Sequence, residues 1–512
     1  MESKVSGFLK ETMAPEILDG FMAPALERTF AVTLPFMSAI NKAHVVMLGE
    51  RGILSGAATR ALLEAISDLE TEGADAFALD PAREEAYFNY EAEVIRRLGA
   101  EVGGRMHVAR SRNDLKSTVD RLHAREKALA IMAATNALRR TLLDRAEAYA
   151  DTVMPGYTHL QPAQPVTYGW FLLGVANGLE RDHARLSDCY GRLNLSPLGA
   201  GAIAGTSFPI DRVRTAELLG FDRPVPHAQD AIACRDAVIE LVSASTFLMT
   251  TVGRLAQDYY VMTTYEFSTM ELPDRVAITS SIMPQKKNMA ALENLKGRAA
   301  YLLGALTTAF ANYKGVPYSH AQDGTADSLR WAWDALDEAV RAVPVARVIV
   351  ESATPRRARM LQLAGENYST ATDLADVLVR EAGLSFRDAH HVVGRVVRLG
   401  LDAGLKADDI GAALVDRAAQ ETLGRPLGLG EETIRTAMDP VKAVESRRHT
   451  GGPSRADTAD MIAEARDVLE RDEAGLRARR ARIAEADAAL QAAVDAIRFG
   501  PVGAARAGEM PT

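Results

Sequence analysis

The feature that most constrains the fold of this chain is a long run without helix breakers. Between Leu115 and Val153 there is neither glycine nor proline, and apolar residues recur at three- and four-residue spacing. This spacing predicts a helix, and one helix over that span would be roughly 58 Å long at about 1.5 Å per residue. Because that is about twice the width of a small domain, we expect an elongated bundle. Similar runs cover residues 166–193, 228–270 and 289–313.

The remaining signals favour an all-α subunit. Strand signals are sparse, and aromatic residues make up only 6% of the chain. The long runs carry apolar residues around much of their circumference, as in residues 238–242, and such helices are buried on several sides. A single bundle cannot easily bury so many long faces, so we expect helices from other subunits to supply the cover. The alternative is one large monomeric bundle.

Changes in sequence texture predict three domains. Residues 1–114 form a mostly helical N-terminal domain, and residues 115–365 form the bundle of long helices. After Gly365 the helical runs are shorter and broken by glycine, so residues 366–512 are assigned to a small helical C-terminal domain with a flexible tail. We interpret the arginine-rich run at 477–482 as a solvated helix face.

Composition limits the possible partners and the compartment. The 512 residues carry a formal charge of -9 and no block of lysine and arginine, which argues against nucleic-acid binding. Cys189 and Cys234 cannot form a disulfide framework, and no Cys/His cluster has zinc spacing. The N-terminus lacks the apolar run of a signal peptide, and stretches such as 241–253 are too short to span a bilayer. We expect a soluble, cytoplasmic protein without a membrane partner.

The segment from Ser280 to Asn288 concentrates hydroxyl, ammonium and amide groups between two long helical runs. Pro284 bars regular helix there, and Asn288 is predicted to cap the following helix. Backbone N–H groups and the helix dipole favour anions at such a helix start. The segment could therefore bind a carboxylate and stabilise the anion formed when a proton leaves the adjacent carbon. The alternative is a surface loop that happens to contain serine and lysine.

A second segment, residues 105–114, precedes the longest predicted helix, which Asn113 or Asp114 could cap. Arg112 offers a planar fork suited to a carboxylate, and Ser111 and Asn113 add hydrogen-bond donors. In the structural alternative, the arginines pair with acids on neighbouring helices.

Two further segments are candidates for the site, one a turn and the other rich in glycine. Residues 154–165 form a turn rich in proline and glycine that presents Thr158 and His159. A lone histidine is more often structural than catalytic, because it needs a partner to fix its tautomer; Glu293 is the candidate partner. Residues 196–212 contain three glycines that permit close backbone approach. They do not form a dinucleotide-binding fingerprint, and a simple connector is the alternative.

These segments resemble one family. The serine segment is similar to the Gly-Ser-Ser-x-Met-Pro-x-Lys-x-Asn loop of the aspartase/fumarase superfamily, with Thr279 replacing the glycine and Met289 replacing the proline that usually follows. Residues 109–114 resemble the Gly-Arg-Ser-Arg-Asn-Asp segment of argininosuccinate lyases, with Ala109 replacing the glycine. Residues 157–165 and 197–206 match the same lyases closely. The resemblance runs from about residue 88 to residue 395.

The resemblance implies a three-domain subunit with a central bundle of long helices, assembled into a homotetramer with active sites shared between subunits. It also implies β-elimination from a succinyl unit, without metal or organic cofactor, to release fumarate. Ser280 would be the base, Lys286 would stabilise the anion, and His159, paired with Glu293 of a different subunit, would assist at the leaving group. The residues implied to bind the substrate are Ser111, Arg112, Asn113, Thr158, Ser281, Met283 and Asn288.

The segment for the leaving group departs from argininosuccinate lyases. His320, Thr325 and Ser328 stand where those enzymes have Tyr, Gln and Lys, and Tyr87 stands where they usually have His. We therefore expect a carbon–nitrogen lyase that acts on another N-substituted aspartate and has His320 in its pocket. Ethylenediamine-N,N'-disuccinate (EDDS) lyases, which cleave aminopolycarboxylates, are the branch that fits best. The alternatives are an argininosuccinate lyase with a drifted pocket, or a non-catalytic structural protein like the lens δ-crystallins.

Overall fold

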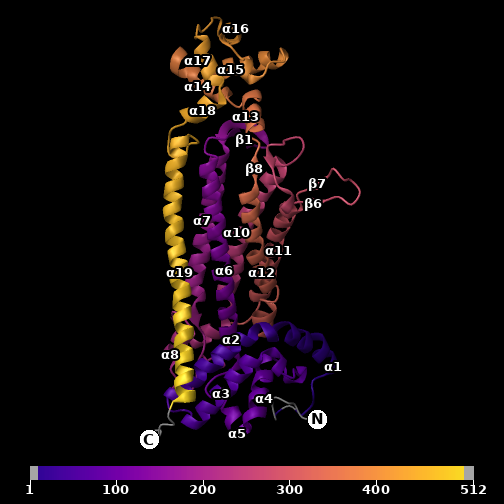
Figure 1. The fold of residues 1–512 in the computed structure, drawn as a ribbon, viewed down its shortest axis with the longest axis vertical. Coiled ribbons are helices and arrows are strands. Elements are labelled where there is room, and N and C mark those ends of the chain that lie inside the picture. Colours follow the sequence, from indigo (N-terminus) through magenta and orange to yellow (C-terminus); the bar gives the residue numbers. More distant parts are fainter. Residues whose placement is uncertain (1–7, 9, 501–512) are drawn as a thin grey trace.

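The computed structural model describes residue 8 and residues 10–500. Helices account for most of this part of the chain, and its strands form four two-stranded sheets. Figure 1 shows long helices running parallel to the longest axis, with the N-terminal helices at one end and a group of shorter helices at the other. The predicted all-α fold with a central bundle of long helices is confirmed.

Five long helices make the centre of the bundle, and α6 is the longest of these five. It begins at Arg112 because Ser111 is the N-cap: the Ser111 hydroxyl accepts from the Asn113 N–H, and the Asp114 carboxylate accepts from the Ser111 N–H at 3.0 Å. The prediction of Asn113 or Asp114 as the cap was therefore wrong. The five helices are α6 (Arg112–Ala148), α7 (Tyr168–Leu193), α10 (Asp236–Met262), α11 (Ala290–Tyr313) and α12 (Ala332–Ser352).

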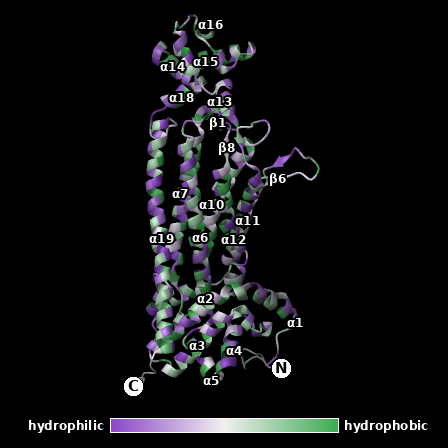
Figure 2. Ribbon diagram, viewed as in Figure 1, coloured by the Kyte–Doolittle hydropathy of each residue, from purple (hydrophilic) through white to green (hydrophobic). Residues whose placement is uncertain are grey.

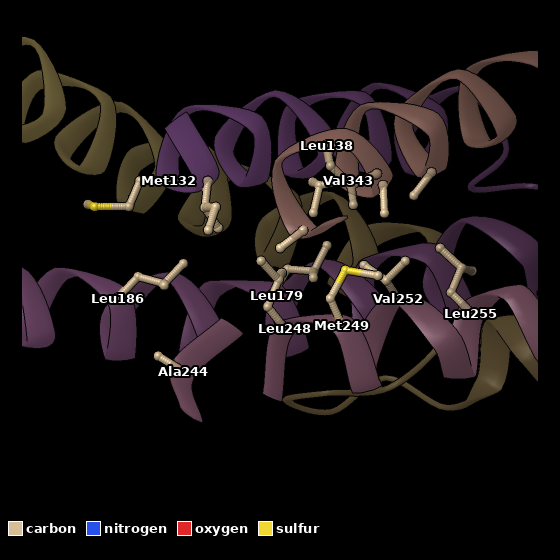
Figure 3. Packing of buried hydrophobic residues seen from close by; sticks show 14 of the residues in the cluster. Met132, Leu138, Leu179, Leu186, Ala244, Leu248, Met249, Val252, Leu255 and Val343 are labelled. Atoms are coloured by element: carbon tan, nitrogen blue, oxygen red, sulfur yellow. The ribbon is translucent and has the colours of Figure 1, made fainter. Parts of the chain in front are cut away.

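Apolar side chains from these helices interlock along the bundle axis. A close-packed interior of this kind contributes stability through the apolar area it removes from water, about 25 cal/mol per Å². Figure 3 shows part of this core, including Met132 and Leu138 of α6, Leu179 and Leu186 of α7, Leu248, Met249, Val252 and Leu255 of α10, and Val343 of α12.

Each end of the bundle has a core of its own. At the N-terminal end, Phe30, Ile66 and Tyr90 are buried together with Leu115 from the start of α6. Its helices are α1 (Pro15–Ile17), α2 (Ala23–Glu50), α3 (Gly56–Glu72), α4 (Ala86–Leu98), α5 (Ala100–Gly103) and α8 (Arg212–Leu218), and the short α9 (Ala228–Ala233) contacts the same end of α6. The helices of the opposite end are α13 (Arg357–Glu366), α14 (Ala371–Ala382), α15 (Phe386–Asp402), α16 (Ala412–Leu423), α17 (Glu431–Met438) and α18 (Pro440–Ser446).

The last helix, α19 (Arg455–Phe499), returns along the whole bundle (Figure 1). Leu469 and Leu476 belong to the bundle core, and Leu490 belongs to the N-terminal core. Within its arginine-rich run, Arg479 donates to the Ser187 hydroxyl at 2.7 Å and stacks on Tyr190. The division into three domains remains our proposal. Although α19 falls within residues 366–512, it packs along the bundle and not with the other helices of that part. The predicted tail beyond residue 500 lies outside the described residues.

Short strands connect the long helices. The segment predicted to be a turn at residues 154–165 is an antiparallel hairpin of β1 (Val153–Thr158) and β2 (Gln161–Thr167). Asn288 was predicted to cap α11 but lies in β7, paired with Ile278, and Met289 occupies the cap position. The other strands are β3 (Leu195–Ser196) with β4 (Arg223–Pro224), β5 (Met270–Glu271) with β8 (Thr354–Pro355), and β6 (Ile278–Thr279) with β7 (Lys287–Asn288).

Two helical stretches, Pro15–Glu50 and Asp236–Met262, are long and apolar enough to cross a membrane. The expectation that every apolar stretch is too short to span a bilayer was therefore wrong for these two, by length and composition. In both, most of the apolar window is buried inside the subunit, 67% and 61% respectively. Figure 2 shows that hydrophobic residues are frequent on α10 at the centre of the bundle, and hydrophilic residues mark much of α19 at its edge. Core packing therefore explains the apolar character of both stretches.

Candidate active site

The serine loop, residues 280–286, is closed at its base by β6 and β7 and projects from the side of the bundle (Figure 1). The Ser280 hydroxyl oxygen accepts backbone N–H bonds from Met283 at 3.1 Å and Ile282 at 3.4 Å. Donors that point at the oxygen favour its ionised form, which is what a serine base requires. The rest of the loop is open to solvent, with Ile282 83% exposed.

Two neighbouring lysines have different surroundings. The Lys287 ammonium donates to the Leu272 carbonyl at 2.5 Å and pairs with Asp274 at 2.8 Å, which anchors the base of the loop. The Lys286 side chain is exposed and has no partner within the described part of the chain. Its ammonium is therefore free to meet an anion that enters beside Ser280.

The hairpin of β1 and β2, here called the histidine hairpin, carries Thr158 and His159 at its tip. Thr158 pairs with Gln161, so His159 and Leu160 form a two-residue turn. Both have positive φ, 53° and 56°, which matches a type I′ turn but is unusual for residues other than glycine and asparagine. Such strain marks candidates for functional sites. His159 is exposed and has no partner among the described residues.

The carboxylate segment, residues 111–113, lies at the N-terminus of α6. Arg112 pairs with Glu84 at 2.7 Å, an acidic partner as in the structural alternative, although Glu84 lies just before α4 and not on a helix. Asn113 donates to the Ala202 carbonyl at 3.1 Å. Ala109 just before it has φ 64°, the left-handed conformation that glycine adopts without strain. This conformation explains why a glycine suits that position in similar sequences.

Asp114 ties the glycine-rich segment to this helix start. Its Oδ1 accepts from the Ser111 and Leu115 N–H groups, and its Oδ2 accepts from Gly199 at 2.9 Å and Gly201 at 3.0 Å. Burial raises the pKa of Asp114 to about 6, against the lowering effect of these N–H donors. A Cβ at Gly201 would meet the Gly205 carbonyl oxygen at 2.6 Å, so this position requires glycine.

His320 lies near the same end of the bundle, after the last turn of α11. Burial first, and then the cations around it, lower the pKa of His320 to about 4. The imidazole is therefore neutral at pH 7, and its buried Nδ1 has no partner within the described chain. The charged residues around it are Lys116, Arg235, Glu85 and Arg112.

In one subunit the predicted residues form three separate groups. The carboxylate segment and His320 are at the N-terminal end of the bundle. The histidine hairpin follows the far end of α6, whose 37 residues span about 56 Å. The serine loop precedes α11, whose 24 residues separate it from the segment of His320 by about 36 Å. A single subunit therefore cannot bring the three groups to one substrate.

Sequence reasoning missed Tyr260 and Glu84 near these groups, and it missed the contact of Asp114 with the glycine-rich segment. The Tyr260 hydroxyl donates to the Glu293 carboxylate at 3.0 Å, Glu84 pairs with Arg112, and Asp114 holds the glycine-rich segment. Tyr260 and Glu293 are 33 residues apart on different helices, so no local pattern connects them. Among the described residues, no group of three or more His, Cys, Asp or Glu side chains could hold a metal ion.

Comparison with known proteins defines the class. The family model described as "Lyase" matches residues 22–304, and that described as "Argininosuccinate lyase C-terminal" matches residues 368–445. The chain is 37% identical over 466 residues to argininosuccinate lyase 1 of Shouchella clausii, which covers 91% of this chain and 94% of the relative. It is 40% identical over 438 residues to argininosuccinate lyase of Methanoculleus marisnigri, covering 85% and 87%.

Solved structures agree with this class. A crystal structure of EDDS lyase in complex with formate has 34% identity and a TM-score of 0.87, covering 96% of this chain and 97% of that one. A class II fumarase from Schistosoma mansoni, 17% identical with a TM-score of 0.69 and covering 86% and 98%, shares the fold. These matches define a carbon–nitrogen lyase. The chain belongs to the argininosuccinate lyase-like branch of the aspartase/fumarase superfamily, as its motifs indicated.

Proposed function

We propose that this enzyme cleaves an N-substituted aspartate, of the aminopolycarboxylate class that includes EDDS, reversibly to fumarate and an amine. The observation that carries the proposal is the changed segment for the leaving group. The Thr325 hydroxyl donates to the Ala321 carbonyl at 2.9 Å, and the Ser328 hydroxyl donates to the Gly324 carbonyl at 2.7 Å. Both side chains are buried and short, so neither offers the amide or ammonium with which argininosuccinate lyases hold arginine.

The remaining residues of the site support the fumarate half of the reaction. Ser280 removes a proton from the carbon beside one carboxylate, the charge passes onto that carboxylate, and the C–N bond breaks. Lys286, Asn288 and the N–H groups of the loop stabilise the doubly negative carboxylate that forms when the proton leaves. Ser111, Arg112 and Asn113 hold the substrate carboxylates, with Thr158, Ser281 and Met283 beside them. His159, paired with Glu293, protonates or orients the leaving amine.

The site is shared between subunits of a homotetramer in this proposal. Two observations support sharing: the three groups are too far apart within one chain, and α11 presents large apolar side chains that stay more than half exposed in the subunit. Tyr301 is 58% exposed, Leu303 57% and Phe310 53%. Because large exposed apolar faces mark interaction sites, neighbouring subunits are expected to pack there. We place the enzyme in the cytoplasm, without nucleic acid, membrane or cofactor.

Argininosuccinate lyase is the second candidate, and the names of the relatives at 37% and 40% identity favour it. The EDDS lyase structure at 34% identity, together with the changed segment, favours the first candidate. The retained Ser280, Lys286, His159 and Glu293 speak against a non-catalytic structural role.

The experiment that distinguishes them is fumarate release, followed by absorbance, from argininosuccinate and from N-alkylaspartates including EDDS. We expect turnover of EDDS-type substrates and none of argininosuccinate. A triple variant, His320→Tyr, Thr325→Gln and Ser328→Lys, should lose part of the EDDS-type activity, because it introduces the three side chains that argininosuccinate lyases have at these positions. Brisk argininosuccinate cleavage by the wild type, without activity on N-alkylaspartates, would overturn the proposal. No release from any substrate would support the structural role.

A further inference from the structure

The carboxylate of Glu293 is held from one side by a residue that no motif singles out. Glu293 lies in the first turn of α11, where its side chain is exposed, and its Oε1 accepts the Tyr260 hydroxyl proton at 3.0 Å. Tyr260 comes from the last turns of α10, which packs along α11. Within the described part of the chain, this hydrogen bond is the one contact that fixes the Glu293 carboxylate.

The tyrosine ring is itself held in place. The Lys296 ammonium lies 4.2 Å from the centre of the Tyr260 ring and donates to the Gln257 amide oxygen at 2.9 Å. Lys296 is one turn after Glu293 on α11, and Gln257 is one turn before Tyr260 on α10. The four side chains therefore make a chain of contacts from Gln257 through Lys296 and Tyr260 to Glu293, in which a cation over an aromatic face adds attraction.

We propose that Tyr260 is a positioning residue that fixes one oxygen of Glu293 and leaves the other aimed at His159 of a neighbouring subunit. This inference rests on the proposed function, because it needs Glu293 to pair with His159. A free carboxylate on an exposed first turn samples several rotamers, whereas one that is bound through Oε1 presents Oε2 in a limited range of directions. Catalysis gains from such fixed geometry, since small misplacements of a catalytic group are costly.

The hydrogen bond also keeps the tyrosine hydroxyl protonated. It raises the pKa of Tyr260, so the hydroxyl keeps its proton and donates over the working pH range. The charged groups that the structure places against Tyr260 are Glu293 and Lys296, both from α11.

The test is Tyr260→Phe, which keeps the ring and removes the hydroxyl. We expect kcat to fall about 10-fold, as for loss of one hydrogen bond to a charged group, with KM changed by less than about twofold. A matched control is Tyr265→Phe, because Tyr265 is 93% exposed and its hydroxyl has no partner in the described chain. An unchanged kcat in Tyr260→Phe would overturn the inference.

Glu293→Gln separates this inference from the proposed function. If Glu293 pairs with His159, Glu293→Gln alone should lower kcat, and adding Tyr260→Phe should lower it no further, because the two residues act as a unit. Full activity of Glu293→Gln would contradict the proposed pair itself. An impaired Glu293→Gln combined with a fully active Tyr260→Phe would contradict only the role of Tyr260. Additive losses in the double variant would show that Tyr260 acts independently of Glu293, and would also overturn the inference.

Discussion

At the scale of single residues, several buried histidines carry lowered pKa values. His123 of α6 stacks on Trp333 with ring centres 4.4 Å apart and lies against Phe36. Burial, assisted by Lys127, lowers the pKa of His123 from 6.5 to about 4. Such a group is neutral in the folded subunit, whereas the unfolded chain takes up its proton as pH falls below 6.5. Stability is therefore lost as pH falls from about 6.5 to about 4.

His123→Phe should remove the share of this loss that belongs to His123 while keeping the aromatic stack. The free energy of unfolding should then decline less between pH 6.5 and pH 4, by up to about 3 kcal/mol at about 1.4 kcal/mol per pH unit. Urea unfolding at several pH values, at one protein concentration, measures this slope. The same slope in wild type and variant would contradict a buried neutral His123. His107, His183 and His320, whose pKa values are also about 4, account for further loss.

At the scale of elements, the hydrogen bonds that Asp114 accepts at the start of α6 determine the shape of the carboxylate segment. Asp114→Asn replaces one of two accepting oxygens by an NH₂ group that faces backbone N–H donors. We expect a loss of about 1–3 kcal/mol of stability and a higher KM for the succinyl part, since Ser111 and Asn113 lose their support. Unfolding and steady-state kinetics test both effects. The control is Asp144→Asn on the exposed face of α6, whose free energy of unfolding should stay within about 0.5 kcal/mol of the wild type. An equal effect in both variants would contradict this role of Asp114.

The elements also show what sequence patterns can predict. Long helices such as α6 and α11 were predictable because apolar spacing records which face is buried. The histidine hairpin was missed because Pro155, Pro162 and Pro165 interrupt strand alternation, and its pairing shifts between Gly156 and Tyr157. The cap at Asn288 was wrong because its backbone pairs with Ile278, a contact that depends on how the loop closes.

At the scale of the whole molecule, motifs supplied the candidate residues but could not supply their arrangement. Three groups that the sequence assigns to one site lie at different places on the subunit, because the helices between them are about 36–56 Å long. The contact of Tyr260 with Glu293 likewise depends on the register of α10 against α11. The separation of the groups itself leads to a prediction about assembly.

Two inactive variants should restore each other when their subunits are mixed. Ser280→Ala removes the proposed base and Arg112→Met removes a proposed carboxylate ligand, and each should be nearly inactive alone. After equal amounts are dissociated and reassembled together, about one site in four should contain an intact Ser280 and an intact Arg112 from different subunits. Activity near a quarter of wild type is the expected result. If mixing restores nothing, while a control mixture with wild type reassembles normally, the two residues act within one subunit.

The reverse reaction distinguishes the proposed fumarate-releasing C–N lyase, whose pocket excludes arginine, from an argininosuccinate lyase. Fumarate is mixed with ethylenediamine, N-substituted diamines or arginine, and its loss is followed for wild type and for Ser280→Ala. We predict consumption with the diamines, none with arginine, and a decrease of about 10²-fold or more in the variant. Consumption with arginine alone would contradict the proposed exclusion of arginine by the segment around His320, and undiminished activity in Ser280→Ala would contradict the proposed base.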